Sequence, residues 1–192
     1  PPSPPLAPPS TPPCVSKIEL VLVLDKSGSV ASAQSSMLAF VRELLSQFSL
    51  SAESGAQVGL VEFSNDAATL TELSASSAAV SLALDGASAA GGGTSVSDGL
   101  ALGLSVLSGA AARPGVPRTL LLLTDGVQTV DGDDSTAIAQ AGVVKAAGVS
   151  VVAVGFGGAA EATMRSIASS PSSDFAFFGG DMDAVRAHFA GG

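Results

Sequence analysis

The segment "LVLDKSGSV", residues 22–30, decides the fold, because a run of core-type residues ends there in three oxygen-bearing side chains. The apolar run over 18–24 is nearly unbroken, which is typical of a central parallel strand covered on both faces. Asp25, Ser27 and Ser29 then follow at alternate positions. The sequence therefore predicts a buried strand whose carboxyl end places oxygen atoms at the rim of a sheet.

Two other segments carry oxygen atoms where loops are expected to leave strands or begin helices. Thr94 follows three glycines at 91–93, and Asp125 follows an apolar strand within "LLLLTDG". Ligand sites in doubly wound sheets lie beyond the carboxyl ends of the strands, so all three loops can meet at one edge. Oxygen-only ligands select hard cations such as Mg²⁺, Ca²⁺ or Mn²⁺ over Zn²⁺. The candidate metal ligands are Asp25, Ser27, Ser29, Thr94 and Asp125.

Strands alternate with helices along the rest of the chain. Strands are expected over 18–24, 57–63, 68–73, 118–123, 149–154 and 175–178. Apolar spacing and capping residues predict helices over 37–48, 76–84, 100–107, 135–147 and 164–168, and after Asp181. This pattern predicts an α/β fold with a doubly wound, mainly parallel sheet, helices on both faces and one antiparallel edge strand.

At this point residues 17–190 resemble a von Willebrand factor type A domain. The letters "DKSGS" at 25–29 match its DxSxS motif, Thr94 within "GGGTSVSDGL" matches its threonine loop, and Asp125 matches its third motif. The resemblance implies a Rossmann-like fold with a metal-ion-dependent adhesion site. It implies that the three hydroxyls coordinate the ion and that the two carboxylates act mainly through bound waters. It also implies that a Glu or Asp of a partner protein completes the coordination.

Several residues near these motifs have simpler interpretations. A threonine such as Thr94 often caps the helix that follows it. Lys26 occupies the variable position of the first motif and is expected to point away from the metal. Asp131, Asp133 and Asp134 lack the distal Glu of a calcium loop, so a solvated loop and helix cap is favoured over a second cation. His188, the only histidine, is interpreted as a structural or surface residue.

Composition divides the chain into a proline-rich segment over 1–16 and a domain over 17–192. Eight prolines within 1–13 exclude helix and sheet and predict an extended polyproline II segment of about 40 Å. A stiff spacer is favoured over a binding strip. The segment is similar to hydroxyproline-rich glycoproteins of extracellular matrices, which favours a secreted, extracellular protein. Cys14 is the only cysteine, so it either pairs with another chain or stays an unpaired thiol.

The charge balance excludes several classes of partner. Eight Lys and Arg against 17 Asp and Glu give a net charge of −9, and the basic residues form no cluster. Nucleic-acid binding through phosphate neutralisation and attachment to an anionic membrane surface are therefore not expected. No apolar run reaches transmembrane length, so direct membrane insertion is not expected either. An acidic surface does suit a cation.

The favoured function is an extracellular adhesion or protein-interaction module that binds an acidic group of a partner through a divalent cation. The alternative is a structural subunit of an extracellular fibre or cell wall, in which the proline-rich arm or Cys14 joins neighbouring copies and the metal is secondary. An enzyme is not expected. An aspartyl phosphatase generally has a second acid where Ser27 stands, Ser29 lies outside a Gly-x-Ser-x-Gly pattern, and no P-loop is present.

Removal of residues 1–14 separates these two functions. If the arm mediates assembly, the shortened chain loses self-association in sedimentation velocity yet titrates divalent cations like the full chain. If self-association is unchanged, the arm is not the assembly contact and the fibre function loses its support.

Overall fold

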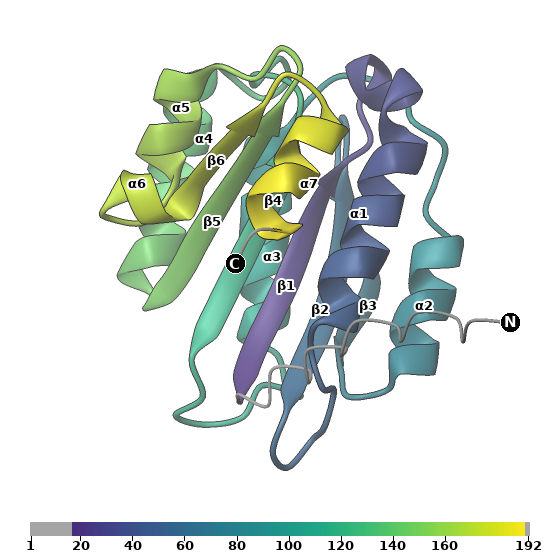
Figure 1. The fold of residues 1–192 in the computed structure, drawn as a ribbon. Helices are drawn as coiled ribbons and strands as arrows, with labels where there is room; N and C mark the ends of the chain where they lie inside the picture. The colour runs from purple at the N-terminus through teal and green to yellow at the C-terminus, as the bar shows by residue number, and fades with distance from the viewer. Residues whose placement is uncertain (1–16, 191–192) are drawn as a thin grey trace, which may run out of the picture.

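The six strands form one sheet in the order β3-β2-β1-β4-β5-β6 (Figure 1). The computed structural model describes residues 17–190, so the proline-rich segment expected over 1–16, including Cys14, lies outside the described residues. All neighbouring strands are parallel except β3, which pairs antiparallel with β2 at one edge. The expected mainly parallel sheet with one antiparallel edge strand is confirmed. The strands are β1 (Ile18–Asp25), β2 (Ala56–Phe63), β3 (Ala67–Ser74), β4 (Arg118–Thr124), β5 (Val149–Phe156) and β6 (Ala176–Gly179).

Helices cover both faces of this sheet. One face is packed by α1, α2 and α7, and the opposite face by α3, α4 and α5 (Figure 1). Within residues 17–190 no helix combines the length and the apolar character needed to cross a membrane. The helices are the 3₁₀ turn η1 (Gly28–Ser32), α1 (Gln34–Ser46), α2 (Ser77–Asp85), α3 (Val96–Leu107), α4 (Asp134–Ala146), α5 (Glu161–Ile167), α6 (Ser172–Phe175) and α7 (Met182–Ala190).

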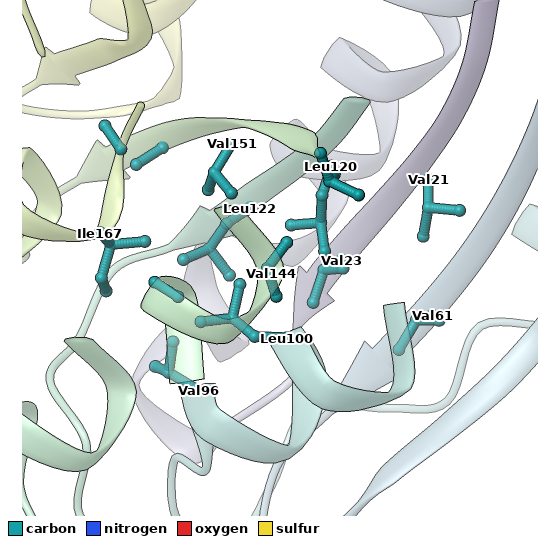
Figure 2. Packing of buried hydrophobic residues seen from close by; sticks show 14 of the residues in the cluster. Val21, Val23, Val61, Val96, Leu100, Leu120, Leu122, Val144, Val151 and Ile167 are labelled. Carbon is teal, nitrogen blue, oxygen red and sulfur yellow. The ribbon is translucent and has the colours of Figure 1, made fainter. Parts of the chain in front are cut away.

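The central strand β1 is buried on both sides, which explains its unbroken apolar run. Successive side chains of a strand point to opposite faces. Val21 and Val23 join the cluster under α3 and α4, which Figure 2 shows with Leu100, Leu120 and Val144. The leucines at positions 20, 22 and 24 join the cluster under α1 and α7. A strand with two buried faces has no place for alternating polar residues, so its first solvent-facing oxygens come only after its carboxyl end.

Two glycines allow α3 to approach the sheet closely. A Cβ at Gly99 would lie 2.8 Å from the ring of Phe63 and 2.9 Å from Val23. A Cβ at Gly103 would lie 2.7 Å from Leu120 and again 2.9 Å from Val23. Such distances are far shorter than ordinary van der Waals contacts. The helix that begins just after Thr94 is therefore seated against the strand that ends in Asp25.

The carboxyl-terminal part differs slightly from the expectation. The last strand was expected over 175–178, but residues 172–175 form the helical turn α6 and β6 begins at Ala176. The short run Phe175–Phe178 has no period that distinguishes a strand from a turn of helix. Asp181 was expected to cap the final helix, and its Oδ1 accepts a hydrogen bond from the amide of Ala184 at 2.8 Å. That cap is confirmed.

A buried ion pair lies at the amino-terminal end of the central strand β1. Glu19 is fully buried, and its Oε1 accepts a hydrogen bond from Nε of Arg113 at 2.7 Å. The same guanidinium donates to four backbone carbonyl oxygens near this end of β1, those of Ile18, Ser51, Ala52 and Gly55. Arg113 lies in the α3–β4 connection, so it ties this connection and the loop at 51–55 to the first residues of β1. One side chain therefore fixes the amino-terminal end of β1, with all five of its N–H donors in use.

The packing of α3 can be tested at its glycines. We expect Gly99→Val to lower the free energy of unfolding by about 1–3 kcal/mol, because overpacking forces side chains out of their rotamers. The matched substitution Gly142→Val lies in α4, where a Cβ meets nothing within 4 Å, and should change stability by less than about 0.5 kcal/mol. Urea unfolding followed by circular dichroism measures both. Equal stability of the two variants would show that α3 is not seated as described.

Candidate metal centre

The site begins with a carboxylate buried at the end of the central strand. Asp25 is the last residue of β1, and its side chain is fully buried. The register of β1 with β4 places it beside Thr124, whose Oγ1 donates to Asp25 Oδ2 at 2.5 Å. The amide of Ser27 donates to the other oxygen, Oδ1, at 2.7 Å. One oxygen of Asp25 is thus oriented by β4 and the other by the loop that follows β1.

The electrostatics of Asp25 are those of a carboxylate removed from water. Burial raises its pKa above the ordinary value, because the charged form loses solvation. The hydrogen bonds from Thr124 and Ser27 oppose this rise, and the nearby Asp125 carboxylate adds a smaller repulsive contribution to it. A positive charge nearby would favour the ionised form of Asp25.

Hydrogen bonds through two serines connect Asp25 to the carboxyl end of the neighbouring strand β4. Ser27 Oγ lies 3.1 Å from Ser29 Oγ. Ser29 Oγ in turn donates to Asp125 Oδ1 at 2.7 Å. Ser27 is buried, whereas Ser29 is exposed at the start of η1. The first and third motifs, 96 residues apart at this contact, therefore meet at the carboxyl ends of β1 and β4.

The glycine loop brings Thr94 to the same place. Its backbone is bound to the first motif, because the amide of Gly28 donates to the carbonyl of Gly92 at 3.0 Å and the amide of Gly91 donates to that of Lys26 at 2.7 Å. A Cβ on Gly126 would lie 3.8 Å from both Ser29 Oγ and Thr94 Oγ1. Thr94 is buried. All five expected ligand residues are therefore gathered at one edge of the sheet.

Two further residues hold Thr94 and were not identified from the sequence. Asn65 Oδ1 accepts the amide of Gly93 at 2.6 Å. Thr129 Oγ1 accepts the amide of Thr94 at 2.9 Å, and the amide of Thr129 donates back to the carbonyl of Thr94 at 2.8 Å. Both lie in loops that follow strand ends at this side of the sheet, Asn65 after β2 and Thr129 after β4. That position is the only signal that could have pointed to them.

Burial within the cluster is graded. Asp25, Ser27 and Thr94 are buried, Asp125 is half-buried, and Ser29 is exposed, so the cluster opens to solvent on the side of Ser29 and Asp125. Within residues 17–190 no three His, Cys, Asp or Glu side chains are grouped so that they could hold a metal. The cluster instead combines three hydroxyls with two carboxylates. Such a donor set suits a hard cation that keeps part of its water shell.

The acidic residues after the third motif have separate structural partners. Asp133 caps α4, since its Oδ1 accepts the amide of Ser135 at 2.9 Å. That hydrogen bond and the one from the Ser135 hydroxyl lower the pKa of this exposed Asp133 carboxylate. Asp134 accepts the hydroxyl of Thr163, and Asp131 accepts that of Ser95. The expected loop and helix cap is confirmed, and these carboxylates do not converge.

The remaining residues singled out from the sequence lie as expected. His188 is exposed, and its Nε2 lies 3.0 Å from the carbonyl oxygen of Phe178. Its ring also lies near the ring of Phe177. Neither Phe177 nor Phe178 belongs to the five-residue cluster. Lys26 directs its Nζ to Oε1 of Glu62, at 3.3 Å. The variable position of the first motif therefore contributes no donor atom to the cluster.

Comparison with solved structures agrees with the topology. Proximal thread matrix protein 1 from the mussel byssus superposes with a TM-score of 0.78 at 23% identity, over 94% of this chain and 46% of that one. Another structure of the mussel protein has a zinc-occupied MIDAS motif. The pilus adhesin SpaC from Lactobacillus rhamnosus GG, in its open conformation, has a TM-score of 0.76 at 21% identity, over 93% of this chain and 30% of that one. This chain thus spans less than half the length of these proteins.

The structure of one isolated domain matches over nearly its whole length. The von Willebrand domain of the type V pili tip protein Mfa5 from Porphyromonas gingivalis has a TM-score of 0.74 at 14% identity, over 92% of this chain and 94% of that one. At such identities the likeness shows the fold. The family itself is shown by sequence, since the family model of the von Willebrand factor type A domain matches residues 19–190. The chain belongs to the von Willebrand factor type A domain family.

Proposed function

We propose that this domain is an extracellular protein-interaction module that binds a carboxylate of its partner through a divalent cation. The ion would be held by Asp25, Ser27, Ser29, Thr94 and Asp125. The observation that carries the proposal is the hydrogen-bonded chain from Asp25 through Ser27 and Ser29 to Asp125, with Thr94 brought beside it. Three loops distant in sequence have no other evident reason to bring five oxygen donors together.

The donor set supports binding of a partner rather than chemistry on a substrate. The three hydroxyls are neutral, and both oxygens of Asp25 already accept hydrogen bonds from the protein. A divalent cation held by few direct anionic ligands remains electron-poor and takes up a carboxylate from outside. Mg²⁺, Mn²⁺ and Ca²⁺ suit the oxygens. Zinc is a further candidate, because it occupies the MIDAS motif of the mussel protein.

The location of the cluster supports the same function. Its open side faces solvent at Ser29 and Asp125, where a partner's side chain has access. The relatives with this fold include a thread matrix protein and pilus proteins. No histidine lies at the cluster to act as the base of a serine nucleophile, since the only histidine contacts Phe178. We therefore favour adhesion over hydrolysis.

Cation binding is tested with two ligand variants. We expect Ser29→Ala and Asp125→Ala each to weaken Mn²⁺ binding by at least about tenfold, since even indirect ligand partners have effects of that size. Ser35→Ala is the matched control, because Ser35 is also exposed but lies in α1 outside the cluster. Electron paramagnetic resonance of free Mn²⁺ gives the affinities, and competition with Mg²⁺, Ca²⁺ and Zn²⁺ identifies the preferred ion. Wild-type affinity in both ligand variants would refute the site.

Partner binding is tested by chelation. The immobilised domain should retain a partner from extracellular matrix extract in Mg²⁺ or Mn²⁺ and release it in EDTA. A column carrying Ser29→Ala should retain none of that partner, whereas a Ser35→Ala column should behave like wild type. A partner that remains bound in EDTA, or that binds the Ser29→Ala column equally well, would place the interface elsewhere on the domain.

A further inference from the structure

An ion pair between a half-buried lysine and a buried glutamate lies directly beside the proposed metal site. Lys26 separates Asp25 from Ser27 in the first motif, and its side chain is 22% exposed. Its Nζ lies 3.3 Å from Oε1 of Glu62, whose side chain is only 5% exposed. Glu62 interrupts the apolar strand β2 at a position that pairs in register with Leu24 of β1. An acidic residue in this buried strand needs a specific reason.

Glu62 also holds the loop that leads to Thr94. The amide of Ser88 donates to Glu62 Oε2 at 2.9 Å, and the hydroxyl of Ser88 donates to Oε1 at 2.6 Å. Both carboxylate oxygens are therefore in use, one by the loop alone and the other by the loop and Lys26. A single side chain connects strand β2, the first metal motif and the segment before the glycines.

The same loop is held at successive points along its length. Gln34, the first residue of α1, donates from Nε2 to the carbonyl of Ser88 at 2.6 Å and accepts the amide of Ala90 at 3.2 Å. Beyond Ala90, the backbone at 91 and 92 is bound to the first motif as described above. Segment 88–92 is thus bound at nearly every residue until two residues before Thr94. The contacts with Glu62 form the start of this series.

The charge of Lys26 gives Glu62 a second role. A cation bound by the neighbouring residues would be repelled by the lysine charge, and such repulsion is weakly screened in a partly buried site. Pairing with Glu62 cancels that charge. A buried ion pair is by itself weak evidence for stability, because desolvation of the two charges offsets their attraction. The geometry therefore favours a role in the site over a role in the core.

We infer that Glu62 is a positioning residue of the metal site, which neutralises Lys26 and anchors segment 88–92 so that Thr94 reaches the ion. This inference rests on the proposed function, because it requires that the site binds a cation. The two roles are separable. Glu62→Gln keeps the shape and most of the hydrogen bonding but removes the charge, whereas Ser88→Ala keeps the ion pair but removes one anchor.

The test compares Mn²⁺ affinity across a small set of variants. We expect Glu62→Gln to weaken Mn²⁺ binding by about tenfold, as loss of a residue behind a metal ligand commonly does. Lys26→Met combined with Glu62→Gln should recover most of that loss, because the uncompensated positive charge is gone. Ser88→Ala should also weaken binding, but adding Lys26→Met should not restore it. Glu43→Gln is the matched control, since Glu43 lies on α1 and forms an exposed ion pair with Arg186 of α7.

The outcomes distinguish this inference from the proposed function. Unfolding in EDTA gives the stability of each variant without metal. If Glu62→Gln binds Mn²⁺ like wild type, the inference fails while the metal site stands. If its affinity loss follows a loss of stability in EDTA and Lys26→Met does not rescue it, Glu62 is merely structural and the inference also fails. If the wild-type chain binds no Mn²⁺, the proposed function fails and the inference with it.

Discussion

The hydrogen bond from Thr124 to the buried carboxylate of Asp25 is the contact on which the rest of this edge depends. It joins the ends of β1 and β4, the two strands between which the winding direction of the sheet changes. At such a switch point the connections leave in opposite directions and open a crevice beyond the strand ends. Because one Asp25 oxygen is oriented from β4 and the other from its own loop, the two halves of the sheet position one acidic group together.

Most of the fold could be predicted from the sequence, because its elements have strong local patterns. The apolar run before Asp25 has no alternation, which is typical of a strand buried on both faces. The last strand was placed less well, since the sequence around Phe175 is too short for a period to show and α6 occupies its first residue. The exact seating of α3 was also beyond the sequence. Gly99 and Gly103 appear as weak helix residues until the facing Phe63 and Leu120 are known.

The five ligand residues could be predicted, but the residues that hold them could not. The ligand motifs have characteristic spacing within short segments. Their supports, such as Asn65, Thr129 and Glu62, are single polar residues whose partners lie 26 to 35 residues away in the chain. No local spacing of residue types identifies these residues in the sequence, because their hydrogen-bond partners come close only when the chain is folded. A Glu in an apolar strand is a departure from pattern that the sequence does display, and it occurs at Glu19 in β1 as well as at Glu62 in β2.

The pairing of β1 has a mechanical consequence. This strand is hydrogen-bonded in parallel to β2 over its full length and to β4 over most of it. Arg113 forms hydrogen bonds with its first residues, and its last residue, Asp25, belongs to the proposed metal site. A tensile load between the segment before β1 and a ligand at the opposite edge would therefore run along the strand axis. Both ladders would resist it together in shear, rather than opening one rung at a time like a zipper.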